Sequence, residues 1–290
     1  MGNIFNLIIL QPILNALVAF IKIFQTVGLP YAFGFSIVAI TVAVRFILHP
    51  FFKQQMHTTR KMQELKPHLD RLSKKHKNDA KRLQQEQMRM YKEAGINPAT
   101  GCLFAIIQIP LFIGLYQTLQ LFLKHDEGGK IVKQINDNLY YSFLKIQNID
   151  PNFFGFNLAS SPAQNGVWYY YLVPVITGAL QYLQTRYTMP EPPKVTKEKE
   201  EKPVTEKGIE VKKETSTGDE FQKAMSTQMK YFFPVMIGYF SYTLPLGLSL
   251  YWNVFSIFSI IQHIHINKKS RPKADQPMAE KGDGLEVKLA

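Results

Sequence analysis

The chain has 290 residues, 46% of them hydrophobic, and it carries a formal net charge of +12. Its 34 basic and 22 acidic residues cluster in a few segments, and the long stretches between them are almost free of charge. Apolar runs of about 18 residues can cross a bilayer as helices, so this distribution argues against a soluble basic protein. The single cysteine, Cys102, excludes an intramolecular disulfide and a metal site built from cysteines.

The first segment, 1–29, is predicted to be an amphipathic helix lying in the membrane interface. Apolar residues recur at helical spacing from Ile4 to Phe24, but polar residues such as Asn15 and Lys22 interrupt them. The alternative is a poor first transmembrane span. The opening residues resemble neither a secretory signal nor a transit peptide, which favours a bacterial inner-membrane protein.

The segment 30–52 is predicted to be the first span, with Arg45 as the only fixed charge between Tyr31 and Phe52. Segment 53–97 is charged and helical, and its apolar residues follow 3–4 spacing in two runs. Asn78 and Asp79 lie between the runs and provide a turn and an N-cap. We therefore expect an antiparallel coiled-coil hairpin that is too polar to enter lipid.

The later spans follow from one more uncharged run, one run that is charged only at Arg186, and one run that is divided in two. Tyr231 to Ile266 has 36 residues without a fixed charge, which is too long for one helix in a bilayer of about 30 Å. Pro245-Leu246-Gly247 provides a turn near its middle, so this run is divided into two short spans. The remaining segments are a second span at 98–123, a loop with some short helix at 124–166, a third span at 167–189, a disordered charged linker at 190–228, the fourth and fifth spans at 229–266, and a basic tail at 267–290.

The fold class is thus all-α, a polytopic membrane protein with five transmembrane helices. Lys53 to Glu93 contains twelve basic and five acidic residues, whereas 124–166 contains four of each. Because positively charged loops stay inside, we expect the hairpin, linker and C-terminus in the cytoplasm and the N-terminus outside. The six basic residues after Ile266 agree with this orientation.

Several stretches resemble the YidC/Oxa/Alb family of membrane protein insertases. GINPATGCLFAIIQIPLFIGLYQTL, from Gly95 to Leu119, is similar to the family's second core span, and ITVAVRFILHPFFKQQ is similar to the first, with its intramembrane arginine. The hairpin and LGLSLYWNVFSIFSIIQHIHINK also match in order and spacing. The resemblance covers most of Ile4 to Lys269 and indicates a bacterial short form, without the extra N-terminal span and large periplasmic domain of some members.

Arg45 is the main candidate functional residue, because a charge at the centre of a membrane span costs roughly 2.5–3.5 kcal/mol. Snorkelling to the cytoplasmic interface would be a purely structural explanation. The resemblance instead implies a hydrophilic groove, open to the cytoplasm, in which the arginine attracts an acidic substrate tail. Thr41 lies one turn earlier and would face the same groove, although a hydroxyl in a span often bonds to its own backbone.

Other polar and aromatic residues complete the predicted groove. Glutamines at membrane depth need partners or water, and Gln184 aligns best with a groove-lining position of the family. Aromatic residues of the last span either line a slide for the passenger helix or anchor the protein at the interface. The full set of candidate groove residues is Arg45, Thr41, Gln108, Gln181, Gln184, Tyr251, Trp252 and Asn253.

No nucleophile–base pair, phosphate loop or metal constellation is apparent in the sequence, so we expect neither an enzyme nor a cofactor. The resemblance implies nascent membrane proteins as substrates, with the Sec translocon as a partner and membrane lipid as the surroundings. The basic tail and cytoplasmic loops suggest contact with the ribosome. The alternatives are a transporter or channel in which Arg45 binds a small anion, and a membrane scaffold whose hairpin recruits a soluble partner.

Overall fold

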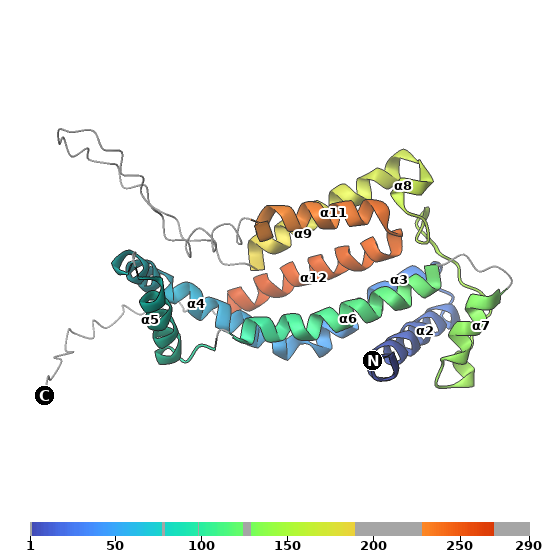
Figure 1. Ribbon diagram of the computed structural model, residues 1–290. Helices are drawn as coiled ribbons and strands as arrows, with labels where there is room; N and C mark the ends of the chain where they lie inside the picture. The colour runs from blue at the N-terminus through green and yellow to red at the C-terminus, as the bar shows by residue number, and fades with distance from the viewer. Residues whose placement is uncertain (1, 77–78, 98, 124–128, 189–227, 270–290) are drawn as a thin grey trace, which may run out of the picture.

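The computed structural model describes residues 2–76, 79–97, 99–123, 129–188 and 228–269 (Figure 1). The described chain is mostly helical, as expected for an all-α protein. The longer helices are α2 (Gln11–Thr26), α3 (Ala32–Ile47), α4 (His49–Lys75), α5 (Ala80–Glu93), α6 (Ala99–Leu123), α9 (Leu172–Thr188), α11 (Phe233–Thr243) and α12 (Leu246–Lys269). The short elements are α1 (Gly2–Phe5), α7 (Lys130–Asp137), α8 (Pro162–Asn165), the π-helical turns Asn6–Leu10 and Gln228–Phe232, and the 3₁₀ turns Ser142–Leu144 and Trp168–Tyr171.

The body of the molecule is a bundle of α3, α6, α9, α11 and α12, the helices that correspond to the five predicted spans. Helix α9 packs against α11 and α12, and α3 packs against α12 and α2. The α4–α5 pair lies at one end of the bundle, and α7 and α8 lie at the other (Figure 1). The predicted linker 190–228 lies almost entirely outside the described residues, and so does most of the tail.

The predicted span at 30–52 is not one straight helix. It breaks after Ile47, and the axes of α3 and the first part of α4 meet at 60°. Pro50, in the first turn of α4, has no N–H and cannot donate a helical bond to the carbonyl of Phe46. The helix that continues into the first arm of the hairpin therefore begins at His49, within the predicted span.

Helix α2 and the π-helical turn before it form the N-terminal element, Asn6–Thr26. Among the described residues this is the helix that is long and apolar enough to cross a membrane, and α3 with the first part of α4 also qualifies if the bent pair counts as one span. Leu17 and Val18 are fully buried in the core shared with α3 and α6. Asn15 donates to the carbonyl oxygen of Asn138, and its Oδ1 accepts from the amide of Tyr140. These bonds attach α2 to the segment that follows α7.

Small residues let α9 and α11 approach closely. A β-carbon on Gly178 would lie 3.5 Å from the carbonyl oxygen of Pro234, and one on Gly238 would lie 3.4 Å from that of Pro174. Such contacts between backbones are the usual packing device of membrane helices, because lipid supplies no hydrophobic driving force between them.

The helices of the bundle differ in length. At 1.5 Å per residue, α3, α9 and α11 rise about 24, 26 and 17 Å, all less than a hydrocarbon layer of about 30 Å. Helix α12 has 24 residues and rises about 36 Å, so the expectation that both C-terminal spans are short holds only for α11. The helix begins directly after Pro245 and continues past Ile266 to Lys269, because no helix-breaking residue occurs within it.

A small sheet in the 124–166 loop is a feature that the sequence did not predict. Strands β1 (Asn152–Phe153) and β2 (Phe156–Asn157) form an antiparallel pair. Phe153 packs edge-to-face on Phe35, and a β-carbon at Gly34 would overlap the Phe153 ring. The absence of a side chain at Gly34 therefore lets the strand pair dock against the beginning of α3.

We expect Gly34→Ala to destabilise the folded protein by about 1–3 kcal/mol, the usual cost of overpacking. A lower midpoint of thermal unfolding in detergent would show this. The control is Gly34→Ala combined with Phe153→Ala, in which the added methyl group has no ring to displace. If the alanine at 34 costs as much in that background as in the wild type, the Gly34–Phe153 contact is not the cause.

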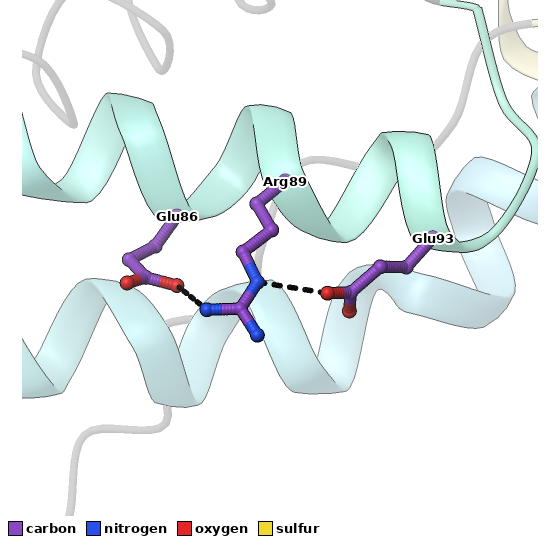
Figure 2. A network of polar contacts seen from close by, with 3 residues as sticks. All are labelled: Glu86, Arg89 and Glu93. Atoms are coloured by element: carbon purple, nitrogen blue, oxygen red, sulfur yellow. Dashed lines mark hydrogen bonds and ion pairs between the residues drawn. The ribbon is translucent and has the colours of Figure 1, made fainter.

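The hairpin consists of α4 and α5, which run side by side (Figure 2). Asp79 caps α5 as its position predicts, since its Oδ1 accepts from the amide of Arg82 at 3.0 Å. On the outer face of α5, Arg89 donates to Glu93 at 2.8 Å and lies 4.0 Å from Glu86 (Figure 2). Both pairs are exposed to solvent, so they add little to the stability of the helix.

Candidate functional site

A cavity of about 1200 Å³ lies between the helices of the bundle and extends along the first part of α4. Arg45 comes from the last turn of α3. The other lining residues are Phe52, Gln55, Met56, Thr59, Arg60 and Gln63 from α4; Gln108, Ile109, Phe112, Ile113, Tyr116 and Gln117 from α6; Gln181, Gln184 and Thr188 from α9; Phe233, Met236, Ile237, Phe240 and Thr243 from α11, followed by Leu244; and Tyr251, Trp252, Phe255, Ser259, Gln262 and His263 from α12.

Arg45 is almost completely buried, with 1% of its surface exposed. Its Nη2 donates to the carbonyl oxygen of Phe255 at 3.1 Å and to the hydroxyl of Ser259. The guanidinium lies 3.5 Å from the ring centre of Phe255 and 4.3 Å from that of Phe52. These cation–π contacts, worth about 2 kcal/mol each when desolvated, and the two hydrogen bonds offset part of the cost of burying the charge.

The remaining nitrogens of Arg45 have no protein acceptor. Within the described chain, Nε and Nη1 make no hydrogen bond, and no carboxylate forms a salt bridge with the guanidinium. One edge of the group is thus held by α12, and the other donors are buried without a hydrogen-bond partner among the described residues. The alternative that Arg45 only snorkels does not fit this geometry, because a snorkelling guanidinium would be exposed at the interface.

Three glutamines around the cavity also have a buried polar atom without a hydrogen-bond partner among the described residues. The Oε1 atoms of Gln108, Gln184 and Gln262 are buried and accept no hydrogen bond from the described residues. A buried amide oxygen without a donor costs about 1–3 kcal/mol, and a polar cavity of this size supplies donors as water or as a bound chain. Buried polar groups thus gather around the cavity at several positions besides Arg45.

Six of the eight predicted groove residues line this cavity. Arg45 and the glutamines at 108, 181 and 184 contribute polar groups, and Gln181 accepts a hydrogen bond from Ser256 at 3.5 Å. Tyr251 and Trp252 contribute aromatic rings, whose centres lie 6.1 and 5.5 Å from that of Phe112. The cavity is thus lined by both polar and aromatic groups.

Thr41 and Asn253 are not among the lining residues. The hydroxyl of Thr41 donates to the carbonyl oxygen of Ile37 at 2.6 Å and is fully enclosed, so it bonds to its own helix. The Oδ1 of Asn253 is buried and accepts no hydrogen bond from the described residues. A place in the groove stays a prediction for these two residues.

Sequence reasoning missed Phe255, Ser259 and Gln262, which hold or surround the arginine. Gln262 also bonds to His49 Nδ1 at 2.6 Å and so connects α12 to the junction of α3 and α4. A signal was available, because Ser256, Ser259 and His263 recur at 3–4 spacing on the last helix. A polar stripe of this kind on an apolar helix indicates a face turned toward other polar groups.

Comparison with known proteins agrees with this geometry. Residues 22–274 match the model of the family described as 60Kd inner membrane protein, which is most of the chain. The chain belongs to this family. The resemblance to YidC/Oxa/Alb proteins is thereby confirmed, and the family is one of inner-membrane proteins.

The match with this chain covers different shares of the length of its individual relatives. The chain is 30% identical over 274 residues to "Inner membrane protein ALBINO3, chloroplastic" of Arabidopsis thaliana, covering 87% of this chain and 50% of that protein. It is 28% identical over 237 residues to "Membrane protein insertase YidC" of Fusobacterium nucleatum subsp. nucleatum, covering 82% and 87%. For the protein of the same name from Oceanobacillus iheyensis, the identity is 26% over 248 residues, covering 83% and 77%. The chain spans about half the length of the chloroplast relatives it matches.

Proposed function

We propose that this protein is a membrane protein insertase that receives nascent hydrophobic segments in the cavity around Arg45. The observation that carries the proposal is a buried guanidinium, two of whose nitrogens have no acceptor among the described residues, beside a cavity lined in part by polar residues. The names of the bacterial relatives, membrane protein insertase YidC, support it.

The mechanism requires no covalent chemistry. A short hydrophilic tail that must cross a membrane loses its hydration, at a cost of several kcal/mol for each charged group. In the cavity, Arg45 and the glutamines replace part of that hydration, and an acidic tail gains a Coulombic attraction of about 4 kcal/mol at 4 Å when the effective dielectric constant is 20. The passenger then moves into lipid because its apolar helix is more stable there. The aromatic residues that line the cavity suit that helix.

The orientation and partners are part of the proposal. We place α3, α6, α9, α11 and α12 across the membrane, with the hairpin and C-terminus in the cytoplasm and the N-terminus outside. The basic excess of the hairpin supports this placement. We place α2 in the outer interface, because Asn15 attaches it to the loop at the end of the bundle opposite the hairpin. The Sec translocon and the ribosome are proposed partners.

Reconstitution into liposomes tests the function. We expect the purified protein to integrate a small single-span substrate without ATP, an ion gradient or the translocon, and protease protection of the translocated tail would measure it. Empty liposomes and liposomes with the Arg45→Met variant are the controls. Uptake of a small anion without integration of the substrate would instead indicate a transporter, and the absence of both activities would favour a scaffold.

A further inference from the structure

The turn between β1 and β2 contains a residue that does not favour its backbone conformation. Phe153 pairs with Phe156, so Phe154 and Gly155 form a two-residue turn between the strands. Both have a positive φ, 48° at Phe154 and 85° at Gly155, as in a type I′ turn. Asparagine and glycine favour these positions, whereas a bulky side chain in the left-handed region is strained. The chain therefore places a phenyl ring at this turn at a cost to the backbone.

Packing within the protein does not offset that cost. The ring centre of Phe154 lies 5.0 Å from that of Tyr31 and 6.0 Å from that of Phe35, yet 63% of the residue is exposed. A phenyl ring stabilises a fold in proportion to the apolar surface that it buries, so a ring that is mostly exposed contributes little. An asparagine would relieve the strain and lose only these two contacts. The ring must therefore gain its stabilisation from the surroundings of the protein.

The position of the turn indicates that these surroundings are lipid. Tyr31 immediately precedes α3 and Phe35 lies in its first turn, at the end of the helix that we place at the outer face of the membrane. Residues 151–157 carry no charge, and Asp150 accepts hydrogen bonds from Asn152 at the base of the strand pair. A polar base with an aromatic tip matches the change from headgroups to acyl chains across a bilayer interface.

We propose that Phe154 anchors the β1–β2 turn in the outer interface of the phospholipid bilayer. The inference rests on the placement of the spans in the proposed function and adds a point of attachment to it. Because the tip has no charge, the anchor requires no anionic headgroup. Arg45 is 14 residues after Tyr31, about 21 Å along α3, so an anchor at the beginning of this helix fixes the depth of the arginine below the outer interface.

The depth of the ring can be measured by tryptophan fluorescence. The full-length protein carries Trp168→Phe and Trp252→Phe, so that Phe154→Trp supplies the emission, in phosphatidylcholine liposomes whose lipids are brominated near the headgroup or near the chain end. We expect quenching about twofold stronger from bromine near the headgroup, with no change when anionic lipid is added. Two reference variants in the same background are Tyr239→Trp, exposed near the centre of α11, and Gln85→Trp, exposed on α5.

The references separate the possible failures. If Phe154→Trp is quenched no more than Gln85→Trp while Tyr239→Trp is quenched strongly, the anchor is overturned and the placement of the spans stands. If Tyr239→Trp is not quenched either, the placement of the spans is refuted, and the anchor with it. Dependence of the quenching on anionic lipid would also overturn the proposal, because charge would then hold the turn. These depths are read without a substrate, so a wild type that integrates nothing would refute the insertase function alone.

A second measurement asks whether the ring holds the turn in place. Phe154→Asn suits the turn better, so by local backbone preference alone it should slow hydrogen exchange at the amides of β1 and β2. We expect it instead to speed that exchange about 3- to 10-fold in liposomes, because the anchor is lost. Tyr31→Gly removes the contact within the protein and leaves the ring of Phe154 in lipid, so it should have a much smaller effect. Unchanged or slower exchange in Phe154→Asn, or an equal effect of Tyr31→Gly, would overturn the proposal.

Discussion

Replacing Arg45 with alanine should lower the integration of substrates with acidic translocated tails about tenfold or more, and that of neutral-tailed substrates by about twofold or less. A tenfold loss corresponds to about 1.4 kcal/mol, which is well below the attraction of about 4 kcal/mol expected for charges 4 Å apart in a partly polar cavity. The measurement is protease protection of the two kinds of tail in matched liposomes.

Two further substitutions separate charge from packing. Arg45→Met keeps a long side chain between Phe52 and Phe255, so it should remove the electrostatic effect while leaving the packing nearly intact. Arg45→Lys keeps a point charge but loses the planar group that bonds to Phe255 and Ser259, and its activity shows whether that geometry matters. Equal loss for both tail types in Arg45→Met would contradict charge attraction as the mechanism.

Lengthening α11 should also reduce integration. Helices α3, α9 and α11 are shorter than a normal hydrocarbon layer, so we infer that the bilayer is thinner beside the cavity. Four leucines inserted between Lys230 and Tyr231 add about 6 Å to the apolar helix. The longer helix reduces the mismatch with the hydrocarbon layer, so the bilayer beside the cavity should be thicker and the barrier to the tail higher. At a few tenths of a kcal/mol per Å, about 6 Å corresponds to about 2 kcal/mol, which predicts an integration rate lower by up to about thirtyfold.

The position of the insertion follows from the structure. The turn at Pro245 is attached to the loop, because Leu246 and Gly247 donate to the carbonyl oxygens of Ser160 and Leu158. An insertion before Pro245 would disturb these bonds, whereas one before Tyr231 leaves them in place. Gly-Ser-Gly-Ser at the same site is the control, since it adds chain without adding apolar helix. If the leucine variant retained full activity at normal abundance, thinning would have no part in the mechanism.

Charge distribution and local signals in the sequence were sufficient to predict the helices of the bundle. A long segment that is almost free of charge can be recognised from its own residues, without knowing what it packs against. The segments that form α6, α9, α11 and α12 could therefore be identified one by one. Asp79 as an N-cap and the turn at Pro245 are equally local, because a capping carboxylate and a missing N–H act within one helical turn. Arg45 was identified as a candidate for the same reason, because a single charge in an apolar segment is visible in the sequence whatever that segment packs against.

Only the tertiary structure decided which polar groups surround Arg45. Ser259 and the carbonyl oxygen of Phe255 are more than two hundred residues away along the chain, and their contact depends on how α3 packs against α12. Thr41 was placed near Arg45 by helical phase, but its hydroxyl bonds to the carbonyl oxygen of Ile37 in its own helix. The contribution of α4 to the cavity likewise depends on the 60° bend after Ile47. Local sequence determines where helices begin and end, but the faces that meet are determined by the packing of segments far apart in the chain.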